Sequence, residues 1–328
     1  TTNTASFVVC PSTRVVTTSA DSGPGSLRQV ILDACPNSTI TFDMTPGHVT
    51  SPITLTTGEL VIDKNLTIQG PTTASLTISG NNNSRVFNVQ TGNSLVMSNL
   101  TITGGKITGD NGGGIFSLGD LTILNSTFTG NQAVGGEGGA IDSEGGTLRI
   151  INSTISGNTA DLSGGGLLHC GSSTGFLTNV TITNNRSDAD GDGTGEGGGI
   201  AQVSSSDLTI NNIIVAGNFK GMSSTANDFF VDVAFGSFID AGSSHNLIGV
   251  DTGLSSDIMN GSGGNQIGTA AMPIDPRLGL LANNGGPTQT HLLLPGSPAI
   301  NAGNNSLALD QNGSALTTDQ RGAGFPRI

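Results

Sequence analysis

The sequence contains no Trp and no Tyr, and aromatic residues make up 4% of its 328 residues. Conventional globular cores use more aromatic bulk, so this scarcity argues against a wide core. Charged residues are also scarce, at 11% against about 25% in typical globular domains. The apolar residues are mainly Val, Ile and Leu in short, regularly spaced runs, a pattern that favours thin β layers over disorder.

Positive charge is scarce too, since 11 Lys and Arg stand against 24 Asp and Glu and the formal net charge is −13. The sequence has no basic cluster that could release counterions, so we expect no nucleic-acid partner. No apolar run approaches the roughly 20 residues of a spanning helix, so we expect no membrane insertion. The sequence shows no signal-peptide pattern at its start, so we expect that any such segment was removed or omitted.

Cysteine is limited to three residues without a C-x-x-C motif, which argues against a zinc framework. Cys10 and Cys35 lie near the N-terminus, and a disulfide between them is expected if the chain is secreted. Cys170 follows His169 inside a repeat. We expect it to be a small buried hydrophobe rather than a nucleophile.

Repetition and glycine, by contrast, are abundant, with 51 Gly in the chain. The element GG[GA][ILV] recurs at Gly112, Gly138, Gly164 and Gly197. A second element, Asn followed by an alternating run and then Asn or Gly, begins at Asn99, Asn125, Asn152, Asn179 and Asn212. Both elements recur every 26 to 33 residues, and a repeat of this length is typical of solenoids. Because each repeat holds short alternating strands and no helical pattern, we predict an all-β fold, a parallel β-helix in which each repeat forms one coil.

Alternation within the second element predicts which side chains point inward. In NLTIT, Leu100 and Ile102 point to one face and the intervening Thr residues to the other, so the apolar face is the interior. The same pattern places three further residues inside, namely Phe128, Ile155 and Ile182. We expect the Asn that begins each element to stack on the next coil as a hydrogen-bonded ladder.

The ends of a solenoid need caps, which divides the chain into three parts. Residues 1–50 form an N-terminal segment with a cap helix, in which Ser26 and Gln29 make a capping box. The apolar face of that helix comprises Leu27, Val30, Ile31 and Ala34. Residues 51–250 form the coils. In residues 251–328 the periodicity fades, and we expect a C-terminal cap or irregular last coils.

Two quoted stretches carry a resemblance to known families. The stretch VVTTSADSGPGSLRQVILDAC resembles the N-terminal module of large secreted bacterial β-helix proteins, and the stretch from Asp275 to Arg327 resembles the signature that closes the choice-of-anchor Q domain. The repeats are similar to those of chlamydial-type polymorphic outer membrane proteins. The resemblance implies a bacterial right-handed, single-stranded parallel β-helix located at the cell surface or in the extracellular space. It implies no particular activity.

Catalysis on such a fold would require two carboxylates roughly 5–10 Å apart, which acids in register on adjacent coils would supply. The residue one 26-residue coil after Asp120 is Gly146, and the residue one coil before Asp142 is Phe116. Neither acid therefore has a second acid in register on that adjacent coil. The Lys and Arg residues stand singly, and the four His residues show no Ser/His/Asp order. We therefore expect no catalytic residues, and a carbohydrate-active enzyme, a polysaccharide lyase or glycoside hydrolase, is the alternative by fold analogy.

One acidic stretch points to a metal. SDADGDGTGEGGG places Asp188, Asp190 and Asp192 at alternate positions before a Gly, which matches the first half of a calcium loop. We predict a Ca²⁺ site with these three carboxylates, the Thr194 carbonyl and Glu196. A flexible acidic loop is the alternative. The stretch lies in the one enlarged coil of the clear repeats, and three acids without a counterion would repel one another.

The outward hydroxyl rows have two interpretations. Thr commonly occupies exposed β positions, but a flat Thr-x-Thr array is also how ice-binding solenoids are built. The rows are Thr101/Thr103, Thr127/Thr129, Thr154/Ser156 and Thr181/Thr183, and they are interrupted at Ile214 and Ala216.

The expected function is that of a non-catalytic structural or adhesive protein, extracellular or at the cell surface, with surface carbohydrate as one candidate partner. A second candidate partner is another copy of the chain. Residues 1–20 hold two β-prone runs, Ser6–Val9 and Arg14–Thr18. Such a segment adds a strand either to its own solenoid end or, head to tail, to the next subunit of a filament.

Overall fold

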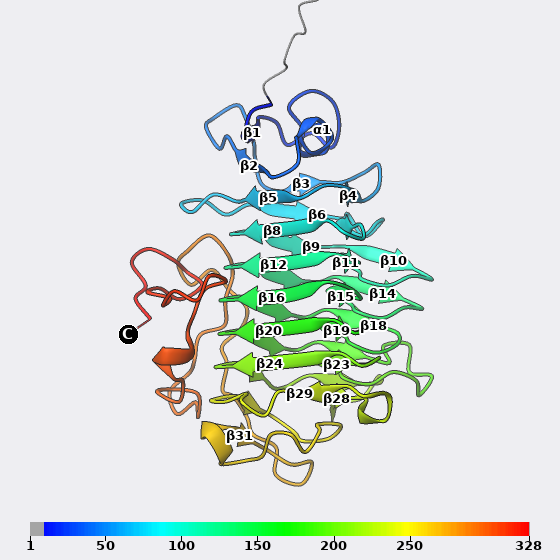
Figure 1. The fold of residues 1–328 in the computed structure, drawn as a ribbon, viewed down its shortest axis with the longest axis vertical. Helices are drawn as coiled ribbons and strands as arrows, with labels where there is room; N and C mark the ends of the chain where they lie inside the picture. Colours follow the sequence, from blue (N-terminus) through cyan, green and yellow to red (C-terminus); the bar gives the residue numbers. More distant parts are fainter. Residues whose placement is uncertain (1–9, 328) are drawn as a thin grey trace, which may run out of the picture.

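The computed structural model describes residues 10–327, and they form a parallel β-helix of about 8 turns (Figure 1). Within this range the strands build four sheets of nine, six, seven and nine strands, here called sheets A, D, C and B. Each full coil passes through the sheets in the order C, A, B and D. Strands of successive coils pair in parallel, apart from the antiparallel pair β26–β27. The predicted all-β parallel β-helix is confirmed.

Sheets A and B carry most of the pairing. Sheet A contains β1 (Thr13–Val16), β2 (Ser38–Phe42), β5 (Leu66–Gln69), β8 (Ser94–Ser98), β12 (Asp120–Leu124), β16 (Thr147–Ile151), β20 (Thr174–Thr178), β24 (Asp207–Asn211) and β29 (Phe238–Ile239). Sheet B contains β3 (Ile53–Thr54), β6 (Thr77–Ser79), β9 (Thr101–Thr103), β13 (Thr127–Thr129), β17 (Thr154–Ser156), β21 (Thr181–Thr183), β25 (Ile214–Val215), β30 (Leu247–Ile248) and β31 (Gln266–Ile267).

Sheets C and D flank the Gly-rich loops. Sheet C contains β4 (Leu60–Ile62), β7 (Phe87–Val89), β11 (Ile115–Ser117), β15 (Ile141–Ser143), β19 (Leu167–His169), β23 (Ile200–Gln202) and β28 (Phe229–Val231). Sheet D contains β10 (Lys106–Thr108), β14 (Gln132–Val134), β18 (Thr159–Ala160), β22 (Arg186–Ser187), β26 (Phe219–Lys220) and β27 (Thr225–Ala226). The helical elements are α1 (Leu27–Asp33) and the 3₁₀ turns η1 (Val233–Phe235), η2 (Ser262–Gly264) and η3 (Asn305–Leu307).

The interior is a single apolar column, as the alternation predicts. Phe128 pairs with Ile102 on one side and Ile155 on the other, and all three are fully buried. The first Gly of each GG[GA][ILV] element has a positive φ, for example 65° at Gly138. At the next position a Cβ on Gly139 would lie 2.3 Å from the Gly165 carbonyl, so the backbones of stacked coils leave no room for a side chain.

A continuous buried asparagine ladder exists, but it is not built by the predicted residues. Of the Asn residues that begin the elements, Asn179 and Asn152 alone form the predicted amide bond, with Asn179 Nδ2 donating to Asn152 Oδ1 at 2.9 Å. The Asn that begins each element adopts the left-handed conformation at the corner, as at Asn125 with φ 48°, where Asn is tolerated better than most residues. The ladder is built instead by the Asn after the alternating run. Asn131, Asn158, Asn185 and Asn218 are fully buried, and the Nδ2 of each of the first three donates to the Oδ1 of the next Asn, at 2.9, 2.9 and 3.0 Å. Asn218 Nδ2 ends the series by donating to Asp228 Oδ1 at 2.9 Å.

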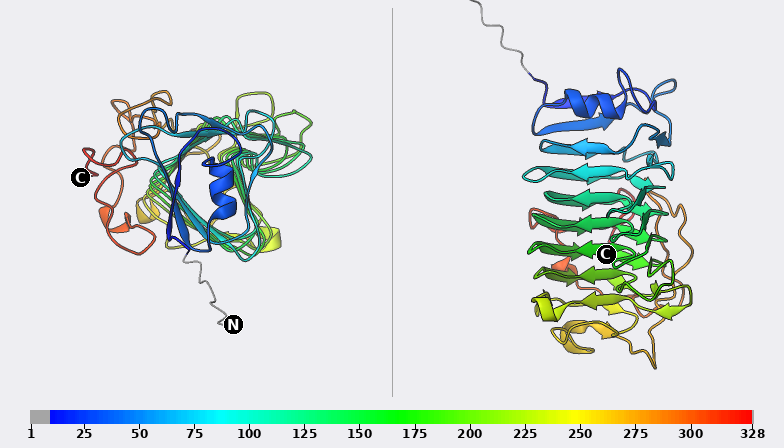
Figure 2. Two further views of the ribbon diagram at one scale, coloured as in Figure 1. Left: turned by 90° about the horizontal axis from the view of Figure 1, so that it is seen from above. Right: turned by 90° about the vertical axis from the view of Figure 1, so that its right-hand side faces the viewer.

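The helix α1 covers one end of the column, as predicted (Figure 2, left). Its residues Leu27, Val30 and Ile31 belong to the core cluster. Ser26 accepts a hydrogen bond from the Gln29 backbone N–H at 3.2 Å, but Gln29 does not complete the capping box. Its side chain donates to Asp33 instead, at 2.9 Å.

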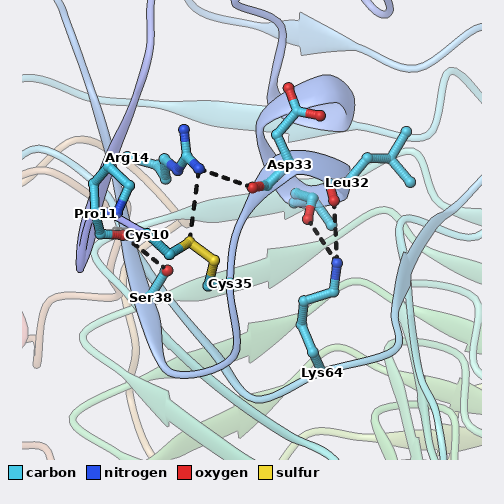
Figure 3. The surroundings of a disulfide bond; sticks show 9 residues. Cys10, Pro11, Arg14, Leu32, Asp33, Cys35, Ser38 and Lys64 are labelled. Atoms are coloured by element: carbon cyan, nitrogen blue, oxygen red, sulfur yellow. Dashed lines mark hydrogen bonds between the residues drawn. A yellow bond between two sulfur atoms is a disulfide. The ribbon is translucent and has the colours of Figure 1, made fainter. Parts of the chain in front are cut away.

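A disulfide within this cap joins the segment before β1 to the segment after α1 (Figure 3). Cys10 and Cys35, the pair named from the sequence, are bonded, and their Cα atoms are 6.3 Å apart. Lys64 of the next coil donates to the Leu32 carbonyl at 3.2 Å, where a cation complements the exposed carbonyls at a helix C-terminus. The cap is therefore held by covalent, polar and apolar contacts together.

The C-terminal part differs from the expected cap. A loop that places Ile258 against the core closes the last coil. Residues 275–327, here called the strap, then fold back along the side of the solenoid (Figure 1, orange to red). Strap residues as far along as Gln320 bond to strands β13 and β17, in the middle of the solenoid. The strap is thus a lateral covering of sheet B rather than an end cap.

Candidate functional site

The strap is attached to sheet B by side-chain hydrogen bonds. Gln320 is the central anchor, since its Nε2 donates to Thr127 Oγ1 at 3.0 Å and its Oε1 accepts from Thr154 Oγ1 at 2.7 Å. Further along, Asn212 Nδ2 donates to the Asn304 carbonyl at 2.9 Å. The outward hydroxyl row that seemed free in the sequence is therefore the attachment surface of the strap.

This attachment removes the central part of the flat hydroxyl array. Thr127 and Thr154 point outward from the interior as predicted, yet their exposed fractions are 0% and 2%. An ice-binding surface needs its hydroxyls open to solvent, and here the strap lies over them. The expectation of an exposed array is wrong at these positions.

Between the strap and sheet B lies a groove that the sequence did not reveal. It consists of two adjoining cavities of about 700 and about 340 Å³, which share Asn179, Leu293, Asp319 and Arg327 in their walls. We call it the strap groove. It follows the corner positions of four successive coils, so its length is three coil spacings, on the order of 14 Å.

Three buried polar atoms in the wall of the larger cavity have no hydrogen-bond partner within the described chain. They are Asn179 Oδ1, His245 Nδ1 and Arg327 Nε. Buried polar atoms are almost always paired, because leaving one unpaired costs about 1–3 kcal/mol. All three residues line the same cavity, and small rotations of their side chains would turn these atoms toward a polar group bound there.

The charged groups of the groove come from the end of the strap. Arg321 forms an ion pair with Asp319 at 2.6 Å and stacks on Phe325, with its guanidinium carbon 4.1 Å from the ring centroid. Burial lowers the pKa of Arg327, and the nearby Asp319 carboxylate acts in the opposite direction. These residues fall in the stretch Asp275–Arg327 singled out in the sequence, but nothing in its pattern showed what they would face.

A Ser–His pair, which sequence order also failed to show, lies in a neighbouring cavity of about 570 Å³. His291 Nδ1 donates to the Gly279 carbonyl at 2.7 Å, and this fixes the tautomer so that Nε2 accepts from Ser156 Oγ at 3.0 Å. Burial lowers the pKa of His291, which keeps the imidazole neutral near pH 7. Ser156 and His291 are 135 positions apart in the sequence, so no local motif predicts that they meet.

The acidic loop, residues 188–196, brings only part of its predicted ligand set together. Oxygens of Asp188, Asp190 and Asp192 lie within 4.8 Å of one another. The hydroxyl and the backbone N–H of Thr194 both donate to Asp192 Oδ1, at 2.6 and 2.8 Å, and these bonds lower the pKa of Asp192. Glu196 is committed elsewhere, since it forms an ion pair with Lys220 and accepts from Asn227 at 3.0 Å. Calcium binding stays a prediction, with Glu196 removed from the ligand set.

The predicted assembly segment is partly outside the described residues. The run Ser6–Val9 lies among residues 1–9 and is not described. The second run, Arg14–Thr18, contributes to β1, which pairs in parallel with β2 of the same chain from Thr13 to Val16. That run therefore acts as the intramolecular strand of the N-terminal cap.

Comparison with known proteins gives no family for the chain. No family model, curated protein or solved structure matches it. The resemblance to secreted bacterial β-helix proteins accordingly remains an expectation. Across residues 10–327, no helix has the length and apolar character needed to cross a membrane.

Proposed function

We propose that this protein is an extracellular adhesive β-helix that binds neutral surface carbohydrate in the strap groove. The observation that carries the proposal is the set of three unpaired polar atoms in the wall of one cavity. Asn179 Oδ1 needs a donor and Arg327 Nε needs an acceptor. A hydroxyl can both donate and accept, so a ligand rich in hydroxyls suits both.

Charge favours a neutral ligand over an acidic one. The whole chain carries a formal net charge of −13, which repels polyanions, and Arg327 already lies close to the Asp319 carboxylate. Leu293 and Pro326 supply apolar wall surface against which the C–H faces of a sugar can pack. The rigid solenoid holds this wall in place, because each coil is paired to its neighbours.

A glycan array followed by calorimetry tests the proposal. The wild-type protein should bind neutral oligosaccharides. Arg327→Ala should weaken binding tenfold or more, since a hydrogen bond from a charged donor is worth about 1.5–3 kcal/mol. Asn179→Gly should act in the same direction without backbone strain, because Gly tolerates its φ of 56°.

Arg277→Ala is the matched control. It also removes a strap guanidinium, but Arg277 is absent from the walls of the strap groove. Its affinity should equal that of the wild type. Equal binding by all the variants, or preference for acidic glycans, would count against the groove.

A second function, ester hydrolysis on carbohydrate, is favoured by the Ser156–His291 geometry alone. The neutral imidazole is placed to take the Ser156 proton as the hydroxyl attacks an acyl carbon. Ser156 is only 3% exposed, so a substrate would have to enter between strap and sheet. Release of acetate from an acetylated polysaccharide, abolished by Ser156→Ala, supports this function; no release from wild-type protein eliminates it.

Two further parts of the proposal rest on the sequence. Calcium would bind the acidic loop through Asp188, Asp190 and Asp192, and assembly would involve residues 1–9. Deletion of these nine residues, followed by sedimentation and electron microscopy, tests assembly. Filaments that form only from the full chain support it, whereas monomers at high concentration in both forms contradict it.

A further inference from the structure

A group of acidic side chains and one thiol lies on the outer face of sheet C, away from the strap groove. Asp142 is the outward residue of β15 and is fully buried. Glu144 follows it by two positions, just after the end of β15. Cys170 lies one coil further on, just after β19, and Glu137 comes from the preceding Gly-rich loop. We call these four residues the thiol–carboxylate cluster.

The ligand-bearing atoms of the cluster converge. One carboxylate oxygen each of Asp142 and Glu144 and the Cys170 Sγ lie within 4.8 Å of one another. The Cys170 Sγ is 4.0 Å from Asp142 Oδ1. The other oxygen, Asp142 Oδ2, is buried and has no hydrogen-bond partner within residues 10–327.

The cluster is also short of positive charge. Asp142 is fully buried close to the carboxylates of Glu144 and Glu137, and the buried Cys170 thiol lies near the same carboxylates. The nearby Arg85 is committed to Glu59 at 3.1 Å and Asp110 at 2.8 Å.

We propose that the thiol–carboxylate cluster binds a divalent metal ion of the zinc class, with Asp142, Glu144 and Cys170 as ligands. Tetrahedral ligation at about 2.0–2.3 Å places ligand atoms roughly 3–4 Å apart, a spacing that small side-chain movements reach from the observed one. The thiol distinguishes this site from the acidic loop, because thiolate favours zinc and cobalt whereas an all-oxygen set favours calcium.

The proposed site has both a buried base and an open side. Asp142 lies underneath, while Glu137 and Glu144 are only partly buried, so an ion can reach the cluster from solvent. A bound cation would supply the partner that Asp142 Oδ2 lacks. Two turns of the solenoid would then be joined by metal in addition to their backbone pairing.

Cobalt titration of the full chain tests the proposal, because a thiolate ligand to Co²⁺ gives an intense near-ultraviolet charge-transfer band. Cys10 and Cys35 are joined in a disulfide, so only Cys170 can give that band. We expect the band at one Co²⁺ per chain, its loss on adding Zn²⁺, and its absence in Cys170→Ser and Asp142→Asn. The Asp142→Asn change preserves side-chain volume, and its melting curve without metal checks that it folds.

Asp192→Asn in the acidic loop is the matched control and should keep the band. A second measurement is the rate of Cys170 alkylation, which Zn²⁺ should slow at least tenfold in the wild type and leave unchanged in Asp142→Asn. A wild-type protein without the band, a band that survives Asp142→Asn, or equal alkylation with and without Zn²⁺ would overturn the proposal.

Discussion

Asn158 stands in the middle of the buried asparagine ladder, and replacing it with alanine removes four hydrogen bonds. Its Oδ1 accepts from the backbone N–H and the Nδ2 of Asn131 at 3.0 and 2.9 Å. Its Nδ2 donates to Asn185 Oδ1 at 2.9 Å and to the Phe128 carbonyl at 3.1 Å. At about 1 kcal/mol for each bond, Asn158→Ala should lower the free energy of unfolding by about 4 kcal/mol.

The assay must resolve where the loss occurs, because solenoids can lose stability locally. Urea denaturation gives the overall change, and amide hydrogen exchange should show the fastest opening in the coils that contain β13, β17 and β21. Asn83→Ala, in an exposed turn, is the control and should change stability by less than about 0.5 kcal/mol. An Asn158→Ala effect as small as that of the control would refute the structural role of the ladder.

Three further outcomes are expected. Ile155→Asp buries a charge in the column and should cost more than about 4 kcal/mol by urea denaturation, whereas Thr67→Asp on an outward face should cost little. Burial lowers the pKa of His169 from 6.5 to about 4, so the unfolded chain binds a proton more tightly than the folded chain does. The free energy of unfolding should therefore fall by up to about 3 kcal/mol as the pH drops from 6.5 through 4. His169→Gln, which copies the in-register Gln202, should flatten that pH dependence in thermal melts; an unchanged slope refutes it. Calcium should raise the melting temperature of the wild type and leave the triple Asp→Asn variant of the acidic loop unchanged, and equal melting curves with calcium and with chelator would reject the site.

Alternation of apolar and polar residues was sufficient to predict the fold and its interior. Leu100 and Ile102 lie inside because each strand has two faces and only one of them can contact the column. The alternation did not predict which Asn residues of successive coils stack on one another. Asn occurs twice in each repeat, and the sequence alone does not show which copy is at the left-handed corner and which is in the ladder.

The candidate sites could not be predicted in the same way, because their residues meet only in the folded chain. Gln320 donates to the Ser126 carbonyl across 194 positions, and nothing periodic connects the two. The thiol–carboxylate cluster was missed for another reason. Acid pairs were sought on adjacent coils, whereas Asp142 on β15 and Glu144 just after it belong to one coil, and the adjacent coil contributes a thiol.

A crystal structure of the protein with its tightest-binding neutral oligosaccharide tests the strap groove most directly. We predict sugar density between Asn179 and Arg327, with hydroxyl oxygens at hydrogen-bonding distance, about 3 Å, from Asn179 Oδ1 and Arg327 Nε. Sugar bound on another face of the solenoid, or a groove that holds only solvent at saturating oligosaccharide, would contradict the proposed function.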